Sequence, residues 1–154
     1  MTRIVDPIDI AAPIDRAFDA ASQVERWPAI LPHYRRVTIG DRRPDGATIV
    51  EMSANRPFGP FNWPTWWMSE MWIDRIRWEV RYRHIRGVTT GMDVVWRLST
   101  TPTGVHIDLV HEWSGPRWLP IGKSLAAAVI MRVFVHGIAW RTLAGIKRKA
   151  ESSK

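Results

Sequence analysis

Cysteine is absent from the 154 residues of this chain. Its absence excludes a disulfide framework, a thiolate zinc site and a cysteine nucleophile. A metal site would depend on five scattered histidines, which lack the spacing of metal ligands. The pair His111-Glu112 does not begin a zinc-protease motif, because Gly115 occupies the position of the second histidine. We expect neither a metal ion nor a cofactor.

Other familiar signatures are also missing. The chain has no glycine-rich phosphate loop, no dinucleotide-binding fingerprint and no Gly-x-Ser-x-Gly nucleophile elbow. Residues 1–7 carry no apolar core of a signal peptide, and the longest apolar stretch, 125–140, is interrupted by Arg132 and His136. These absences weigh against nucleotide-dependent enzymes and serine hydrolases, and we expect a cytoplasmic protein.

Positive charge and tryptophan are what the chain has in excess. Lys and Arg number 22 against 15 Asp and Glu, which gives a formal net charge of +7. Such a charge favours anionic partners without specifying a fold. The chain has 10 Trp but only 2 Tyr and 4 Phe. Because the indole ring is large and also donates a hydrogen bond, this excess indicates a lined cavity or an adhesive surface in addition to a core.

The N-terminal part reads as one strand followed by short helices. Alternation of apolar and polar residues predicts the strand at 3–10. Pro13 stands where the first turn of a helix tolerates proline, so 14–21 is predicted to be helical. The dipeptides Trp27-Pro28 and Leu31-Pro32 limit the next segment to a short helical turn and a bend.

From residue 34 the period of the apolar residues changes to two, which is typical of strands. The segments 34–39 and 47–54 flank a Pro-Asp-Gly turn and predict a hairpin. The clearest alternation is at 76–84, where arginines are predicted on one face of a strand. The opposite face is predicted to be buried and holds Ile76, Trp78, Val80, Tyr82 and His84. Further strands are predicted at 66–74, 92–98 and 105–113.

A long helix is predicted to close the chain, since 121–150 carries apolar residues at helical spacing. Its predicted buried side holds Leu125, Val129, Val133, Trp140 and Leu143. This order of elements predicts an α+β fold, in which a curved antiparallel sheet wraps around the long helix and two short helices lie near the N-terminus. One helix cannot fill such a curve, so we expect a cavity between them. The length suits a single domain at 1–151 with a disordered tail at 152–154.

Several motifs carry a family likeness: Ile10-Ala11-Ala12-Pro13, Val24-Glu25-Arg26-Trp27-Pro28, Leu31-Pro32-His33-Tyr34, Gly91-Met92-Asp93-Val94-Val95-Trp96 and the C-terminal helix. With them the chain resembles, over nearly its whole length, the START-like (SRPBCC) superfamily, and within it the polyketide cyclase/dehydrase and coenzyme Q-binding group. The resemblance implies a helix-grip fold with a hydrophobic cavity between the sheet and the C-terminal helix. Members include lipid carriers, quinone-binding proteins and aromatic polyketide cyclases, so the site must decide the function.

Polar residues on faces predicted to be buried are the candidate site residues, because a buried polar group needs a partner in the protein, in water or in a ligand. His84 and His111 lie on apolar strand faces, and His136 lies on the predicted inner side of the long helix. Arg132, one helical turn earlier, is expected either in solvent or against an anionic ligand head. We predict that the ligand-binding residues are Trp27, Tyr34, Trp67, Ser69, Met71, Trp78, Tyr82, His84, Trp96, His111, Trp113, Arg132, His136 and Trp140.

The aromatase/cyclase members of the resembled group match this chain at Trp27, Tyr34 and Ser69, but they carry an arginine, implicated in orienting the polyketide, where this chain has Met71. Without that cation the wall is more apolar, which favours binding over catalysis of an aldol closure. Arg56, on the same hairpin, is the candidate replacement.

The predicted function is therefore the binding or transport of a hydrophobic small molecule: a lipid, an isoprenoid quinone or a polycyclic aromatic. The alternative is a polyketide aromatase/cyclase without a cofactor. In that case protons would be donated and accepted by Tyr34, Ser69, His111 or His136.

Two surface features bear on partners. Arginines at 75, 77, 81 and 83 form a basic row, but the aromatic residues alternate onto the opposite face, so a nucleic-acid-binding module is only a minor alternative. A basic surface suits an anionic membrane better. The segment Phe58 to Trp67, rich in Phe, Trp and Pro, is predicted to be a loop that gates the cavity, packs on a second subunit or dips into a membrane. Monomer and homodimer both stay open.

Overall fold

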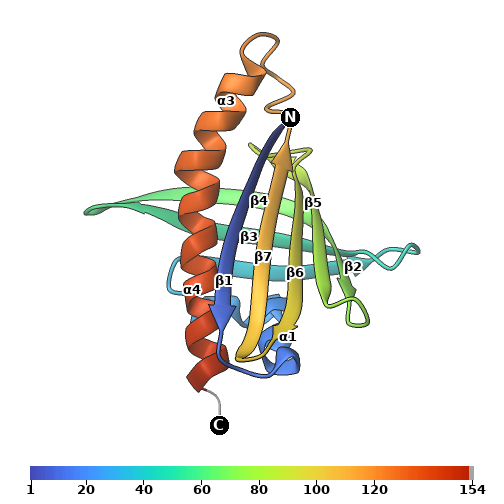
Figure 1. Ribbon diagram of the computed structural model, residues 1–154. Coiled ribbons are helices and arrows are strands. Elements are labelled where there is room, and N and C mark those ends of the chain that lie inside the picture. The colour runs from blue at the N-terminus through green and yellow to red at the C-terminus, as the bar shows by residue number, and fades with distance from the viewer. Residues whose placement is uncertain (153–154) are drawn as a thin grey trace.

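The strands form one antiparallel sheet in the order β1-β7-β6-β5-β4-β3-β2 in this computed structural model, which describes residues 1–152 (Figure 1). Strands β2 to β7 follow each other as a meander, and only β1 crosses over, to pair with β7. The strands are β1 (Thr2–Ile10), β2 (Tyr34–Arg42), β3 (Thr48–Phe58), β4 (Phe61–Asp74), β5 (Glu79–Gly87), β6 (Asp93–Thr101) and β7 (Gly104–Trp113).

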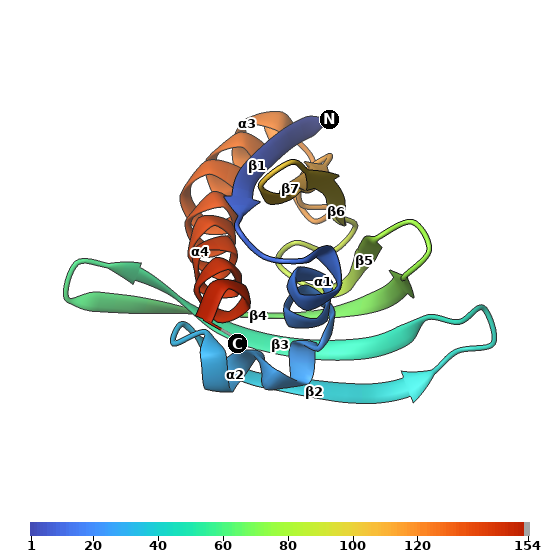
Figure 2. The same cartoon turned by 60° about the horizontal axis from the view of Figure 1, so that its bottom comes forward.

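The helices lie in two groups. Between β1 and β2 come α1 (Ile14–Ser22), a 3-10 turn (Val24–Arg26) and α2 (Trp27–Ile30). After β7 one helical stretch is built from α3 (Lys123–Ile130), a π-helical turn (Met131–Val135) and α4 (His136–Ser152). Viewed from the end, the sheet bends into an incomplete ring, and α4 closes its open side (Figure 2). The α+β helix-grip fold predicted from the sequence is therefore confirmed.

The helical stretch Lys123–Ser152 has two further features. It continues to Ser152, which the sequence placed in a disordered tail, while residues 153 and 154 lie outside the described part of the chain. Its length and composition would also allow it to cross a membrane. Its most apolar stretch has a mean hydropathy of 1.3, and 22% of that stretch is buried. Core helices of globular proteins share this length and composition.

The segment predicted as the loop Phe58 to Trp67 is mostly strand, because β3 and β4 continue as a hairpin to a turn at Gly59 and Pro60. The loop was predicted because prolines usually interrupt strands. Pro57 lies beyond the last residue of β3 that pairs with β2, and Pro64 lies beyond the first residue of β4 that pairs with β5. Each proline therefore sits on a locally free strand edge, where no backbone N–H is needed. We call residues 55–66 the β3–β4 tip.

The predicted dry face at 76–84 is wrong at its start. Ile76 is 93% exposed, in the turn before β5. This turn forms because Asp74 Oδ1 accepts hydrogen bonds from the backbone N–H groups of Ile76 and Arg77. Trp78 follows with a positive φ of 57° and packs edge-on against Phe18 of α1, with ring centroids 5.2 Å apart. Strand alternation therefore begins only at Glu79.

The predicted buried side of the long helix is wrong at three of its five residues, while Leu143 is buried and Val133 is half-buried. Leu125, Val129 and Trp140 are exposed, whereas the residues buried against the sheet include Ala127, Met131 and Ala139. Residues 125–135 are apolar on nearly all sides of the helix, so their periodicity does not select one face. The π-helical turn has more residues per turn than an α-helix, so it shifts the buried face away from the one that α-helical spacing predicts.

Candidate functional site

A cavity of about 520 Å³ lies between the concave face of the sheet and the helical stretch. Most of its lining is apolar, with side chains such as Met52, Met92 and Leu109 from the sheet and Ile138 from α4. Its exposed lining residues are Trp63, Pro64, Trp66 and Val88, from the β3–β4 tip and the turn between β5 and β6. The mouth of the cavity therefore lies between these two segments.

Aromatic rings form one wall of the cavity. Trp27 packs against Tyr34 and Trp96, with ring centroids 5.0 and 5.8 Å away. Tyr34 in turn meets Trp67 edge-on, and Trp67 stacks on His84 with an interplanar angle of 10°. Because each ring is held by another, these flat surfaces are presented to the cavity in fixed orientations.

Two buried polar atoms in the cavity lack partners. The Tyr82 hydroxyl and the His111 Nδ1 have no hydrogen-bond partner among residues 1–152. Their neighbours are satisfied: His84 Nδ1 lies 2.6 Å from Thr89 Oγ1, and the Tyr34 hydroxyl has the side chain of Thr142 as its partner. Since an unpartnered buried polar group is costly, these two atoms mark where a ligand's own polar groups would be bound.

Burial keeps all of these groups uncharged. It lowers the pKa of His84 to about 4, and together with the neighbouring charges of His84 and His136 it lowers the pKa of His111 to about 3. Burial also raises the pKa of Tyr34 and of Tyr82 well above the ordinary value. At neutral pH the cavity thus offers neutral imidazoles and protonated phenols, which hydrogen-bond to carbonyl and hydroxyl oxygens. Within the described residues no three His, Cys, Asp or Glu side chains gather as a metal site.

Half of the predicted ligand-binding residues line this cavity. These are Trp27, Tyr34, Trp67, Tyr82, His84, Trp96 and His111, which come from α2 and five strands. The structure brings them together as the alternation of the strands predicted. Their role in binding remains a prediction.

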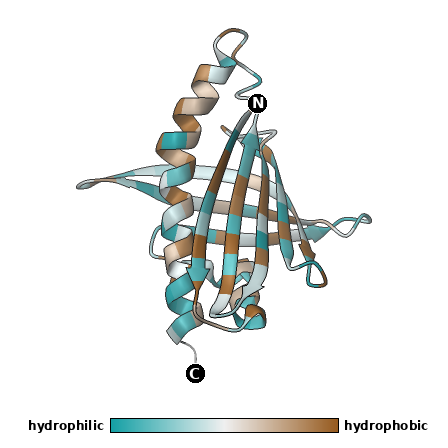
Figure 3. Cartoon of the chain, in the orientation of Figure 1, coloured by the Kyte–Doolittle hydropathy of each residue, from teal (hydrophilic) through white to brown (hydrophobic). Residues whose placement is uncertain are grey.

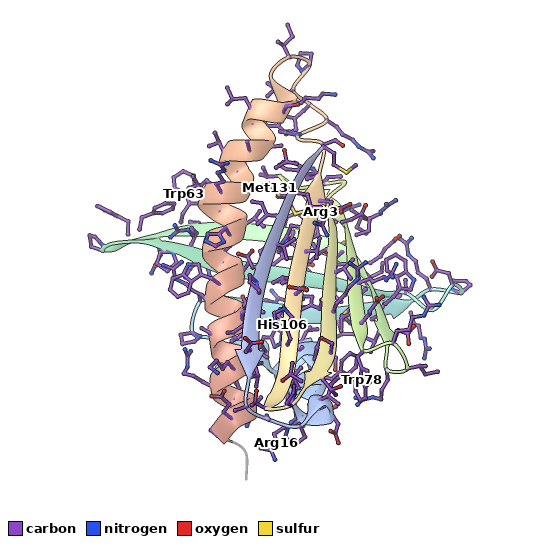
Figure 4. All side chains as sticks on the ribbon, in the orientation of Figure 1. Arg3, Arg16, Trp63, Trp78, His106 and Met131 are labelled. Carbon is purple, nitrogen blue, oxygen red and sulfur yellow. The ribbon has the colours of Figure 1, made fainter. Side chains whose placement is uncertain are left out.

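Four other predicted residues are shielded from the cavity or lie beyond it. Ser69 and Met71 are buried in β4 without lining the cavity, and the Ser69 hydroxyl has no hydrogen-bond partner in the described chain. Trp113 is a core residue whose indole N–H donates to the carbonyl of Thr90. Trp78 packs on α1, at the end of the sheet away from Trp63 (Figure 4).

The three predicted helix residues point away from the cavity. Arg132, His136 and Trp140 are exposed, because the buried side of the helix is rotated from the predicted one. His136 Nδ1 lies 2.5 Å from Oδ1 of Asp6 on β1. Burial raises the pKa of Asp6, and the hydrogen bond and charge of His136 oppose that rise. The histidines of the sheet and of the helix therefore do not converge.

Arg56 does not replace the missing cation at Met71. Its guanidinium donates to the backbone carbonyls of Val133 and Pro57 and lies 4.3 Å over the ring of Phe58. It therefore fastens the β3–β4 tip to the π-helical turn instead of facing a ligand.

Several lining residues escaped the sequence prediction. They include Met52, Thr89, Met92, Phe134 and Thr142. The alternation in 47–54 contains a signal for Met52, since it shares a face with Val50 and Ala54. Phe134 and Thr142 carried no usable signal, because the inner side of the helix could not be derived from its composition.

The fold and cavity agree with what known proteins share with this chain. Residues 1–151 match the family model described as polyketide cyclase/dehydrase and lipid transport, and the chain belongs to this family. A provisionally named polyketide cyclase of Streptomyces cyaneus is 27% identical over 128 residues, which cover 81% of each protein.

Solved structures extend this comparison. An aromatase/cyclase from a Streptomyces species, Zhui, superposes with a TM-score of 0.80 at 20% identity, covering 97% of this chain and 93% of that one. A START superfamily protein from Mycobacterium smegmatis gives a TM-score of 0.63 at 14% identity, covering 97% of both chains. At such identities the likeness establishes a START-like fold and nothing finer.

Proposed function

We propose that the protein is an aromatase/cyclase-type enzyme that folds an oxygen-rich polyketide chain in its cavity and promotes ring closure. The observation that carries this proposal is the pair of unpartnered polar atoms, the Tyr82 hydroxyl and the His111 Nδ1, inside an otherwise apolar cavity. A purely hydrocarbon ligand would leave both atoms unsatisfied, whereas a carbonyl or hydroxyl oxygen would satisfy them. The names of the relatives support the same class of substrate.

The reaction proposed is an intramolecular aldol condensation. A methylene carbon between two ketones gives up a proton to water and forms a bond to a ketone carbon further along the chain, whose oxygen takes up a proton from water. Loss of water from the resulting alcohol then places a double bond in the ring. The rings of Trp27 and Trp96 would hold the flat product, while Tyr82 and His111 would hydrogen-bond to the oxygens.

Neutral donors take the place of a cation in this mechanism. Since Met71 occupies the position of the arginine and Arg56 is engaged elsewhere, no guanidinium stabilises the developing oxyanion. With pKa values of about 4 and 3, His84 and His111 are weak bases but can donate hydrogen bonds as neutral imidazoles. Their proposed role is to orient and polarise a carbonyl.

A second candidate, carriage of a hydrophobic molecule without chemistry, is favoured by the apolar lining and by Met71 itself. The two are distinguished by following a synthetic poly-β-ketone thioester by mass spectrometry. An enzyme accelerates the loss of one water for each ring closed, and Tyr82→Phe and His111→Phe slow that step by about 10²-fold. A carrier binds the chain, as reported by tryptophan fluorescence, but leaves the rate at its uncatalysed value, and that result would reject the proposal.

A further inference from the structure

Large apolar side chains are exposed on two projections of the molecule. Phe61 and Trp63 lie at the β3–β4 tip, 75% and 59% exposed. Trp118 and Ile121 precede α3, and Leu125 and Val129 follow at spacings of one helical turn. We call these residues the apolar rim: Phe61, Trp63, Trp118, Ile121, Leu125 and Val129. Figure 3 shows apolar residues along this upper part of the helix.

The two projections are physically joined. Phe58 and Trp63 pack edge-on against Phe134 of the π-helical turn, with ring centroids 5.8 and 6.1 Å away. Arg56 Nε donates to the carbonyl of Val133, at 2.7 Å. The β3–β4 tip is therefore held against the helical stretch that carries Leu125 and Val129. Only 22% of the apolar stretch in Lys123–Ser152 is buried.

The segments that carry the apolar rim contain only positive charges, and the carboxylate of Glu51 reaches the β3–β4 tip from outside these segments by accepting a hydrogen bond from the Trp66 indole N–H. No Asp or Glu occurs between Glu51 and Glu70 or between Glu112 and Glu151. Exposed cations occur at Arg117, Lys123 and Arg132, and none of the three forms an ion pair with a described residue.

The basic row on the outer face of the sheet is different, because its arginines are paired. Arg81 pairs with Glu79, and Arg83 forms two hydrogen bonds to Asp93. That face is therefore electrostatically satisfied, whereas Arg117, Lys123 and Arg132 have no ion-pair partner among the described residues.

We infer that the apolar rim docks on the surface of an anionic phospholipid membrane. Tryptophan and phenylalanine side chains flanked by lysine and arginine are the composition that inserts at the boundary between headgroups and acyl chains. A second copy of the chain is a poorer occupant, because face-to-face pairing would bring together like cations. The rim also consists of projections and not of a groove, which suits insertion between lipids better than binding of a peptide.

Docking in this way has a consequence for the cavity. Trp63 belongs both to the apolar rim and to the mouth of the cavity, beside Trp66. The mouth would face the lipid, so that an apolar molecule could pass between bilayer and cavity without crossing water. This inference goes beyond the proposed function, because an aldol reaction does not require a membrane.

The test is flotation of the purified protein with vesicles of phosphatidylcholine, alone or mixed with phosphatidylglycerol. We expect binding to the mixed vesicles that weakens as salt is added, with a blue shift of tryptophan emission. Phe61→Ser combined with Leu125→Ser should reduce vesicle affinity about tenfold or more, since neither side chain lines the cavity but both would leave the lipid. Ile76→Ser is the control, because Ile76 is even more exposed than Phe61 and Leu125 but lies in the turn between β4 and β5.

Three results would overturn the inference. One is the absence of binding to the mixed vesicles, and another is equal loss of affinity in Ile76→Ser. The third is a dimer of the wild-type protein in light scattering that Phe61→Ser with Leu125→Ser dissociates, which would assign the rim to a second copy. None of these readouts depends on catalysis, so failure of the proposed function leaves the test intact.

Discussion

The two tyrosines of the cavity make the clearest contrast at the scale of single residues. Both side chains are buried on the concave face of the sheet, and burial raises the pKa of both. Tyr34 has the side chain of Thr142 as a hydrogen-bond partner, whereas the hydroxyl of Tyr82 has none in the described chain. The same residue type is therefore structural at one position and available to a ligand at the other.

This contrast predicts opposite effects of removing the two hydroxyls. Tyr82→Phe should raise the free energy of unfolding of the ligand-free protein by about 1 kcal/mol, because it deletes an unsatisfied buried group. The same change should weaken binding of anthraquinone about tenfold and leave binding of anthracene unchanged, since only the former carries carbonyl oxygens. Urea denaturation and titration of tryptophan fluorescence measure the two effects.

Tyr34→Phe is the matched control for that prediction. It should lower the free energy of unfolding by about 1 kcal/mol, because the Thr142 side chain loses a partner. Equal destabilisation by both variants would mean that Tyr82 has a hydrogen bond in solution, and the argument for an oxygenated ligand would fail.

At the scale of elements, the β3–β4 tip and the long helix depend on each other. Arg56 of β3 binds the carbonyl of Val133, which lies within the π-helical turn. The guanidinium fits there because residue 137 is glycine, and a Cβ atom at that position would lie 2.0 Å from Arg56 Nε. A glycine in the middle of a helix is thus explained by the approach of a side chain from another element.

Two variants test this dependence. Arg56→Ala should lower the free energy of unfolding by about 1–2 kcal/mol and speed amide hydrogen exchange in the β3–β4 tip. Gly137→Ala should speed exchange at the same amides with little net loss of stability, because alanine favours the helix by about 1 kcal/mol while displacing the guanidinium.

Arg36→Ala is the control for the first of these variants. Arg36 is exposed and its side-chain hydrogen bond, to Thr38, stays within β2. We expect a change in the free energy of unfolding within about 0.5 kcal/mol and no effect on exchange in the tip. Unchanged exchange in Arg56→Ala would show that packing on Phe134 alone holds the tip.

These elements also show what the sequence could predict. Period-two alternation located six of the seven strands closely, and it placed Tyr82, His84 and His111 on the face that lines the cavity. The prediction failed where the structure depends on contacts between segments that are distant in the sequence or on a local change in helix type. A proline interrupts a strand that has a neighbour on both sides, but Pro57 and Pro64 lie where their strands pair on one side only. The inner side of the long helix depends on a π-helical turn, which composition does not reveal.

At the scale of the whole molecule, buried histidines link stability to pH. Burial lowers the pKa of His33 and His84 to about 4 and that of His111 to about 3, from the ordinary value of 6.5. In the unfolded chain these imidazoles take up protons below about pH 6.5, whereas in the folded protein they stay neutral until the pH falls to about 4 or lower. Between about pH 6.5 and 4, proton binding therefore stabilises the unfolded state relative to the folded state.

The free energy of unfolding should consequently fall as the pH is lowered from about 6.5 towards 4. Each imidazole contributes a loss of up to about 2 kcal/mol by about pH 5. His106 acts in the opposite direction, because hydrogen bonds to Asp9 and Asp108 raise its pKa, so its stabilising contribution is present in acid and is lost as the pH rises through that raised value. Urea denaturation at several pH values should show His84→Gln flattening the acid loss and His106→Gln steepening it. A wild-type protein equally stable at about pH 5 and pH 7 would mean that water reaches the buried imidazoles, and the cavity could not then hold them as neutral donors.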